Sequence, residues 1–446
     1  MGEGIGEMIA RKPAVIIAVV LALASACAAG DLLSYVAQPD SSFKWEKVSK
    51  TESPVGVDYL LKMTSQTWQG IAWVHDIELV VPSKCDYPET AILLITGGRP
   101  NNESRAIQNA LAVGAGCPVA TLFGIPNQPL FGGKSEDALI AHTFVKAMET
   151  GDDTWPLLLP MTKAALRAMD AVQEFSRSEL GKQVTGFVVS GASKRGWTTW
   201  LTAAADRERV KAIVPVVYDN LNLAAQMAHQ IAFWGKYSDQ IQDYTRLGVQ
   251  DALATDRGKH LASIVDPWAY RERITVPKLI INGTNDPYWT LDALNLYWDD
   301  LRGPKFVLYV PNAGHDVAAG PGAMLKVLGT ATTFVRAIAS AERLPEITWN
   351  RSTGKSSCRL EITTGSKDAT AVLWTAGSDS LDFRKAKWRS TPMTASAQGF
   401  AAELAPPKKG YLAFFGELNL TLGGRKCALS TQLTIVGPDG STPQGK

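Results

Sequence analysis

Between residues 55 and 340, short apolar runs alternate with stretches that have the periodicity of amphipathic helices. Each run has the length and composition of a buried strand, and the six are Ile92–Thr96, Val119–Phe123, Val184–Val189, Ile213–Val217, Leu279–Asn282 and Phe306–Val310. This alternation predicts a mostly parallel sheet covered by helices on both faces, because parallel neighbours need long crossover connections. Two consecutive strands at residues 59–63 and 72–81 predict an antiparallel start to the sheet.

A sharp turn follows the third run. The segment Gly191-Ala192-Ser193-Lys194-Arg195-Gly196 separates that run from a helical pattern that begins near Trp197. Glycines at both crowded positions let the backbone turn tightly and let neighbouring elements approach. A serine at such a strand-to-helix turn is typical of a nucleophile elbow, although Arg195 stands where that motif usually has its second glycine.

Two further polar residues, Asp286 and His315, follow the fifth and sixth runs. Serine, then acid, then histidine, each just past a strand, is the chain order of the triad in α/β-hydrolases. A serine hydroxyl needs an adjacent base before it can attack a carbonyl. We therefore expect an α/β-hydrolase fold in which Ser193 is the nucleophile, His315 the base and Asp286 the residue that orients His315.

Nearby residues offer alternatives and substrate contacts. Asp219 follows the fourth run and could be the acid or contact a substrate, while His229 could reach the site as the base. Trp289, three residues after the expected acid, could stack on a sugar. Lys194 and Arg195 lie in a first helical turn, where the helix dipole disfavours cations. They imply a compensating anion, which is either a carboxylate that braces the turn or an anionic group of the substrate.

Acyl transfer also needs N–H donors for the negative charge that develops on the carbonyl oxygen. The backbone amide of Lys194, directly after the serine, is one candidate. The amides of Gly97 and Gly98 are the others, because a glycine pair just past the first run is similar to the oxyanion loop of esterases. The sequence has no metal-ligand pattern and no phosphate-binding loop, so we expect neither a metal nor a cofactor.

The pattern changes along the chain and suggests its domains. Residues 31–345 carry the α/β pattern and form the expected hydrolase domain. Within them, residues 218–275 are long for one connection, so we expect a cap over the carboxyl ends of the strands. Residues 346–440 alternate in polarity without helices, which predicts a C-terminal antiparallel β-sandwich. Residues 441–446 are expected to be a mobile tail.

Residues 1–30 have the features of a secretory signal peptide, since two basic residues precede an apolar run and Ala28-Ala29-Gly30 offers a cleavage site. We therefore expect a secreted, extracellular protein, or a periplasmic one in a bacterium. Lipidation at Cys27 is an alternative. No other run is long enough for a membrane span. With 45 basic and 43 acidic residues the net charge is +2, which gives no reason to expect nucleic acid as a partner.

An oxidising compartment favours disulfides. The cysteines that follow the expected signal peptide are Cys85, Cys117, Cys358 and Cys427, and four cysteines allow three pairings. We expect Cys85 to pair with Cys117 and Cys358 with Cys427, because each bond then stays inside one domain.

Several short segments carry a resemblance, and they are Thr64–Trp68, Leu159–Ala165, Ser190–Trp200, Val276–Lys278 and Pro311–His315. Together they resemble the PhoPQ-activated pathogenicity-related protein family, and the segment around Ser193 is the most specific. The resemblance implies a secreted α/β-hydrolase with an appended β-sandwich, with Ser193, Asp286 and His315 at the family's triad-like positions. It supplies no substrate, and it implies that some members act as extracellular signals.

These observations predict a secreted serine hydrolase that cleaves an ester or amide bond through an acyl-enzyme. The substrate could be a small molecule, a glycan or a peptide, and a polysaccharide ester is the case in which Trp289 and the sandwich would bind carbohydrate. The alternative is a secreted signalling protein on a hydrolase scaffold, bound by a cell-surface receptor without catalysis, because a fold does not determine function by itself.

Overall fold

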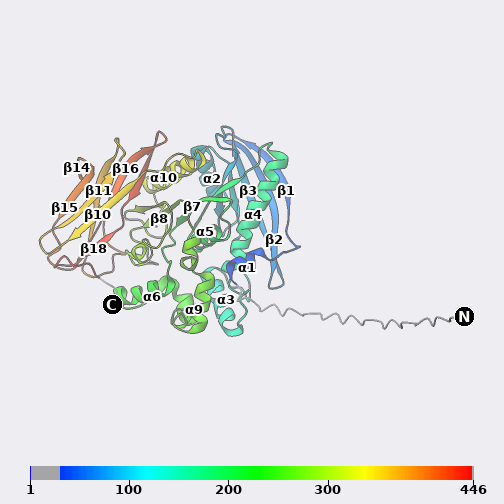
Figure 1. Cartoon of the computed structure of the whole chain (residues 1–446), viewed down its shortest axis with the longest axis horizontal. Helices are drawn as coiled ribbons and strands as arrows, with labels where there is room; N and C mark the ends of the chain where they lie inside the picture. The colour runs from blue at the N-terminus through cyan, green and yellow to red at the C-terminus, as the bar shows by residue number, and fades with distance from the viewer. Residues whose placement is uncertain (2–30, 444–446) are drawn as a thin grey trace.

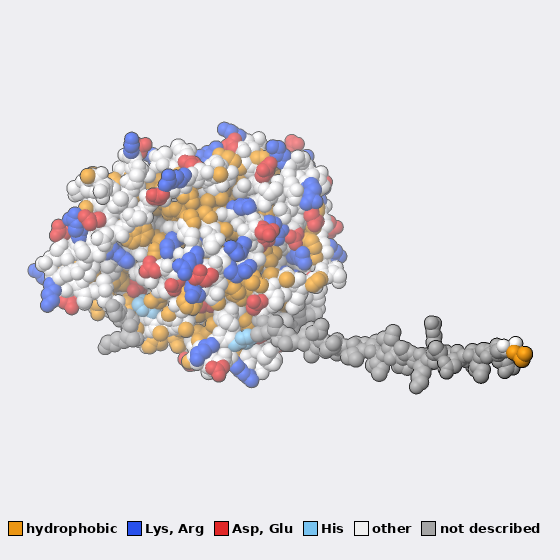
Figure 2. Space-filling model, viewed as in Figure 1, with side chains coloured by type: hydrophobic (Ala, Val, Ile, Leu, Met, Phe, Trp, Pro, Cys, Tyr) orange, Lys and Arg blue, Asp and Glu red, His pale blue; other side chains and the backbone are white. Residues whose placement is uncertain are grey.

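The computed structural model describes Met1 and residues 31–443. Residues 2–30 of the predicted signal peptide and the last three residues of the predicted tail lie outside the described residues. Within 31–443, no helix combines the length and the apolar character that crossing a bilayer requires. On the face shown in Figure 2, basic and acidic side chains are intermixed rather than separated into regions of one sign.

Fourteen of the described strands form one long sheet that runs through the molecule (Figure 1). Their order is β1-β2-β3-β5-β4-β6-β7-β8-β9-β17-β16-β12-β13, and β18 pairs with β16. Their bounds are β1 (Lys44–Ser53), β2 (Gly56–Trp68), β3 (Ile71–Pro82), β4 (Thr90–Ile95), β5 (Val119–Leu122), β6 (Gly186–Ala192), β7 (Val210–Val216), β8 (Lys278–Gly283), β9 (Lys305–Val310), β12 (Thr370–Ser378), β13 (Arg389–Pro392), β16 (Tyr411–Leu422), β17 (Arg425–Ser430) and β18 (Thr434–Val436). The six predicted apolar runs are confirmed as β4 to β9, and neighbouring strands among them are parallel.

Helices cover both faces of the parallel part of the sheet (Figure 1). Helices α4 and α5 pack on one face, while α2 and α10 pack together on the other. The helices outside the cap are α1 (Leu32–Ala37), α2 (Asn102–Ala115), α3 (Glu136–Thr150), α4 (Leu158–Glu179), α5 (Lys194–Ala205), the short 3₁₀ helix η3 (Ala293–Leu296) and α10 (Pro321–Ala339). Each face buries its own apolar cluster, as expected for a sheet whose strands are apolar on both sides. The predicted α/β-hydrolase architecture is confirmed.

The connection between β7 and β8 consists mainly of short helices joined by loops. Its elements are α6 (Leu223–Trp234), η1 (Asp239–Ile241), α7 (Gln242–Arg246), α8 (Val249–Ala252), α9 (Asp256–Val265) and η2 (Pro267–Arg273). Helix α3 packs against α7, α8 and α9, so this segment is held against the body of the molecule. We call it the cap.

The C-terminal strands form two packed antiparallel sheets, which confirms the predicted sandwich. One sheet has the order β10-β11-β15-β14, with β10 (Ile347–Thr353), β11 (Cys358–Thr364), β14 (Thr394–Ser396) and β15 (Gly399–Leu404). The other is a continuation of the main sheet, because Ser430 of β17 pairs with Val307 of β9. An ion pair also joins the two parts, since Lys326 Nζ of α10 donates to both carboxylate oxygens of Glu417 at 2.8 Å.

The expected disulfides are not formed in the structure. Cys85, Cys117, Cys358 and Cys427 are free thiols, and the last three are buried. Burial raises the pKa of Cys117 and that of Cys427 to about 12. Because the thiolate is the reactive form, these apolar surroundings lower the reactivity of both thiols.

Candidate active site

Ser193 lies at the turn between β6 and α5, as predicted. Its backbone has φ 57° and ψ −125°, a conformation that residues other than glycine rarely adopt. The N–H of Ser193 donates to the carbonyl of Val216 at 2.8 Å, so the turn is fastened to the end of β7. Strain of this kind persists only where surrounding contacts impose it.

The two glycines of the turn are required by close packing. A Cβ at Gly191 would lie 2.6 Å from the carbonyl oxygen of Arg195, and one at Gly196 would lie 2.9 Å from Cβ of Tyr218. Both contacts are shorter than carbon atoms tolerate. The tight turn is therefore achieved with its second glycine one residue later than in the usual motif.

His315 and Asp286 are paired at the carboxyl end of the sheet. His315 Nδ1 and Asp286 Oδ2 are 2.8 Å apart, and Asp286 Oδ1 accepts the backbone N–H of Tyr288 at 2.9 Å. The Tyr288 ring stacks on the imidazole with 4.0 Å between ring centroids. The other imidazole nitrogen, Nε2, is buried and forms no hydrogen bond with any described residue, Ser193 included. The histidine is thus oriented by its acid, with one nitrogen left unused.

The loops that carry this pair are locked together. The backbone N–H of Asn285 donates to the carbonyl of Ala313 at 2.8 Å. A Cβ at Gly283 would lie 2.2 Å from the carbonyl oxygen of Gly314, so the two loops are in direct backbone contact. The acid and the base therefore hold their relative position through main-chain contacts as well as through their own hydrogen bond.

A segment of the sandwich reinforces both loops. It is the connection between β12 and β13, residues 379–388. Asn285 Nδ2 donates to the carbonyl of Ala386 at 2.8 Å. Asn312 Nδ2 donates to the carbonyl of Trp388 at 3.1 Å, and Asn312 Oδ1 accepts the Trp388 N–H at 2.8 Å. Sequence analysis missed these asparagines, because their partners lie in a loop some 75 to 100 residues away.

The first turn of α5 is braced by two carboxylates from the start of α3. Arg195 donates from Nη1 and Nη2 to the two oxygens of Glu136, both at 2.7 Å. Lys194 Nζ lies 3.1 Å from Glu136 and 3.1 Å from Asp137. Of the two anions considered for this turn, a carboxylate and a substrate group, the structure supplies the carboxylate. Arg195, predicted to bind substrate, is instead committed to Glu136, and a Cβ at Gly97 would collide with its guanidinium.

Burial alone would raise the pKa of Glu136, but the hydrogen bonds and charge of Arg195, helped by Gln128 and Lys194, outweigh it. The pKa of Glu136 is lowered to about 2. Glu136 is therefore ionised at neutral pH and balances the cations at the start of α5. That balance removes the conflict with the helix dipole that two cations in a first turn would otherwise create.

Two alternatives from the sequence lie elsewhere. Asp219, predicted to contact substrate, is buried and accepts the hydroxyl of Tyr297 at 2.6 Å. Burial, with the charges of Asp286 and Asp292 adding to it, raises the pKa of Asp219 to about 7. His229 pairs with Asp292 at 2.8 Å and lines a different cavity from Ser193. Asp219 lines a small neighbouring cavity together with Asp286 and Trp289, and neither Asp219 nor His229 lines the cavity of Ser193.

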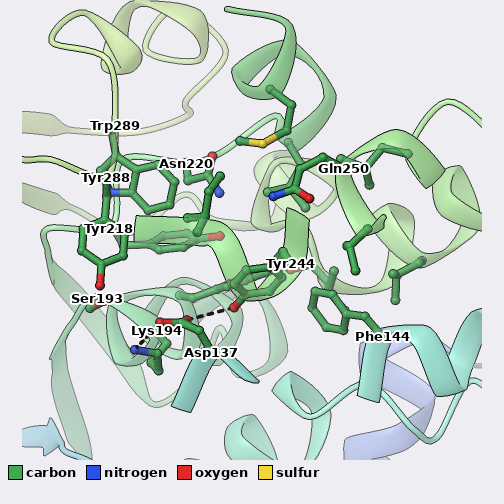
Figure 3. Close-up of a pocket in the computed structure, with 18 residues that line it drawn as sticks. Asp137, Phe144, Ser193, Lys194, Tyr218, Asn220, Tyr244, Gln250, Tyr288 and Trp289 are labelled. Carbon is green, nitrogen blue, oxygen red and sulfur yellow. Dashed lines mark hydrogen bonds and ion pairs between the residues drawn. The ribbon is translucent and has the colours of Figure 1, made fainter. Parts of the chain in front are cut away.

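Ser193, Lys194 and Trp289 line one cavity, of about 70 Å³, between the sheet and the cap (Figure 3). Tyr288, which stacks on His315, lines the same cavity. Lys194 is the first residue of α5, so its N–H is one of the four that have no acceptor inside the helix. Gly97 and Gly98 follow β4, and Gly97 lies against the guanidinium of Arg195, next to the turn. The oxyanion role of all three amides stays a prediction.

The sheet order, the serine turn and the histidine–acid pair after later strands define an α/β-hydrolase scaffold. The chain belongs to the PhoPQ-activated pathogenicity-related protein family, whose sequence model matches residues 32–384. It is 32% identical over 442 residues to autocrine proliferation repressor protein A of Dictyostelium discoideum, an alignment that covers 90% of this chain and 88% of that protein.

Solved structures of low sequence identity are similar in fold to part of this chain. Acetyl xylan esterase 1 from Thermoanaerobacterium sp. JW/SL YS485 is 16% identical, with a TM-score of 0.49 over 69% of this chain and 91% of that chain. An acetyl xylan esterase from Paenibacillus sp. R4 is 13% identical, with a TM-score of 0.49 over 69% of this chain and 92% of that chain.

Glu136→Gln is expected to lower the free energy of unfolding at pH 7, because two mostly buried cations lose a charged partner. The folded-state pKa of Glu136, about 2, lies below its ordinary value of 4.5. Its contribution is therefore present above about pH 4.5 and is lost as the pH falls towards 2. Urea unfolding of both proteins between pH 7 and pH 2 measures this difference. A gap that stays constant over that range contradicts the proposed bracing, and Glu149→Gln, in an exposed pair with Lys146, is the control.

Asn312→Ala is expected to loosen both loops of the histidine–acid pair, because it removes two hydrogen bonds to the sandwich segment. Hydrogen exchange followed by mass spectrometry should show faster exchange in residues 283–288 and 311–317. Asn350→Ala, at an exposed position on β10, should leave both segments unchanged. Unaltered exchange in the Asn312 variant would show that the sandwich segment does not hold these loops.

Proposed function

We propose that this protein is a secreted serine hydrolase that cleaves an ester or amide bond through an acyl-enzyme. The observation that carries the proposal is the His315–Asp286 pair at 2.8 Å, with the second imidazole nitrogen buried and unpartnered among the described residues. Tyr288 connects this ring to the cavity of Ser193. The strained backbone of Ser193 supports the same role, because strain of this kind collects at functional sites.

In this mechanism, His315 Nε2 takes the hydroxyl proton of Ser193 as the oxygen attacks the substrate carbonyl. Asp286 stabilises the imidazolium, and the backbone N–H of Lys194 is the first candidate donor to the oxyanion. His315 then passes the proton to the leaving alcohol or amine. A water molecule, deprotonated by His315, attacks the acyl-enzyme, and His315 returns that proton to Ser193 Oγ as the bond between the acyl group and the serine breaks and the acid leaves. The contact between nucleophile and base often tightens only in the reacting complex, which is consistent with the unformed Ser193–His315 hydrogen bond.

A fluorophosphonate probe, which reacts with activated serines, tests this mechanism directly. We expect the folded protein to be labelled and Ser193→Ala to be unlabelled. His315→Ala should label more slowly by a factor on the order of 10³ or more, because the serine loses its base. Ser263→Ala, an exposed serine on α9, is the control. Absence of labelling on folded protein would end the proposal.

A second function is supported by the relative that carries a signalling name. Autocrine proliferation repressor protein A is similar to this chain over 90% of this chain's length. The competing proposal is therefore that this protein is an extracellular signal bound by a cell-surface receptor. In that case the scaffold would present a surface, and the Ser193 hydroxyl would be dispensable.

Adding purified protein to proliferating Dictyostelium discoideum cells separates the two functions. If the protein signals by binding, wild-type protein and Ser193→Ala should slow proliferation equally. Loss of the effect in Ser193→Ala, together with labelling of the wild-type protein, would show instead that the effect depends on catalysis. Cell counts over several doublings at matched protein concentrations give the measurement.

A further inference from the structure

The cavity beside Ser193 has more room than the smallest acyl groups need. Its volume is about 70 Å³. That is several times the roughly 10–15 Å³ that one water molecule needs. An acetyl group would place only a methyl carbon in it and leave most of the cavity unfilled.

The walls next to Ser193 are flat aromatic rings (Figure 3). Trp197 and Tyr218 stack with ring centroids 5.1 Å apart and planes 20° apart. Trp289 meets Tyr218 edge to face, at 6.2 Å and 80°. Ring pairs prefer such offset and edge-on arrangements, so a further flat ring that enters this space meets ring surfaces of the kind it packs on. Aliphatic side chains of the cap close the remaining wall.

Two amide side chains, Gln250 and Asn220, bring unused acceptors into this apolar cavity. They are 7% and 6% exposed, and neither side-chain oxygen accepts a hydrogen bond from a described residue. Gln250 Nε2 donates to Oγ1 of Thr245 at 3.1 Å, which fixes the orientation of the amide. Figure 3 shows Gln250 and Ser193 on opposite sides of the cavity. The hydroxyl of Tyr218, which also lines the cavity, is likewise buried without a hydrogen-bond partner among the described residues. A carbonyl oxygen can only accept, whereas a hydroxyl can donate and accept, so these groups fit a ligand hydroxyl, which can do both.

The charges at the cavity are already balanced. Lys194 Nζ is shared between Glu136 and Asp137, each at 3.1 Å. Asp137 also accepts the hydroxyl of Tyr244 at 3.0 Å. Lys194 and Asp137 are the charged residues that line the cavity within the described part of the chain. A ligand carboxylate would therefore lose its hydration without gaining a free cation.

We propose that this cavity binds an uncharged aromatic ring carrying a hydroxyl group, as the acyl side of the ester that Ser193 attacks. The proposal rests on the proposed hydrolase function. The ring lies among Trp197, Tyr218 and Trp289, and its hydroxyl donates to the amide oxygen of Gln250 or Asn220. A site built to bond a hydroxyl discriminates strongly against a ligand that lacks one, because its buried acceptor is left unpaired.

Binding to the unreactive Ser193→Ala protein tests the cavity without needing catalysis. The ligands are 4-hydroxyphenylacetamide, phenylacetamide and 4-carboxyphenylacetamide, followed by tryptophan fluorescence, since Trp197 and Trp289 line the cavity. We expect the hydroxylated amide to bind about ten-fold more tightly than phenylacetamide, and the carboxylated one to bind more weakly than both. Equal affinities for the first two, or tightest binding of the carboxylate, would overturn the proposal.

Introducing Gln250→Leu into Ser193→Ala should reduce the ten-fold preference, while Gln240→Leu, exposed in the same cap, should preserve it. Should the Gln250 variant not fold, the ligand series alone decides.

With wild-type protein, methyl 4-hydroxyphenylacetate should be hydrolysed with a higher kcat/KM than methyl phenylacetate, and both with a higher kcat/KM than methyl acetate. Selective binding without hydrolysis or labelling of Ser193 would sink the hydrolase function and leave the ring-binding cavity. Hydrolysis of the esters without a preference for the hydroxylated ring would support the hydrolase function and overturn the ring-binding cavity.

Discussion

The backbone conformation of Ser193 is the constraint on which the site depends. A residue held in a sparsely populated conformation costs about 1–3 kcal/mol, so the surrounding structure must hold it. The hydrogen bond from the Ser193 N–H to the carbonyl of Val216 fastens this residue to β7. The close contacts at Gly191 and Gly196 fix the position of α5 against β6 and β7. The same turn places the serine side chain and the first N–H groups of α5 at one edge of the sheet. One backbone feature thus fixes both the nucleophile and the donors nearest to it.

Charge balance around that turn is the second requirement. The helix dipole disfavours a cation in a first turn by about 0.3–1 kcal/mol, whereas an unpartnered buried charge costs several kcal/mol. Lys194 is 9% exposed, so the cost of burying its charge is larger than the cost of the helix dipole. The ion pairs with Glu136 and Asp137 offset that cost. Their presence joins α3 to α5, and it also leaves the neighbouring cavity without a free cation. The contacts that stabilise the turn therefore also determine what kind of ligand the cavity can accept.

The sequence predicted the parts of this molecule that topology imposes. Strands β4 to β9 were recognisable because buried parallel strands are continuous apolar runs, and the His315–Asp286 pair followed from chain order along such a sheet. Partners distant in sequence were not predictable. Nothing in the chain indicates that Glu136, among 43 acidic residues, is the one that meets Arg195. Asp219 also follows a strand, and nothing in the chain indicates that it is buried against the hydroxyl of Tyr297.

The sandwich belongs to the site, because hydrogen bonds connect it to the base at two points. Strand β9 leads directly into the loop of His315, and β17 pairs with β9. From β17 the pairing continues through β16 and β12. The segment after β12 then returns to the same loop, where Trp388 meets Asn312. These contacts form a closed circuit of hydrogen-bonded elements along the main sheet, so the loop of His315 is held both through β9 and through Asn312. A scaffold without the sandwich would keep the serine turn, which depends on β6 and β7, but would lose the support that orients its base.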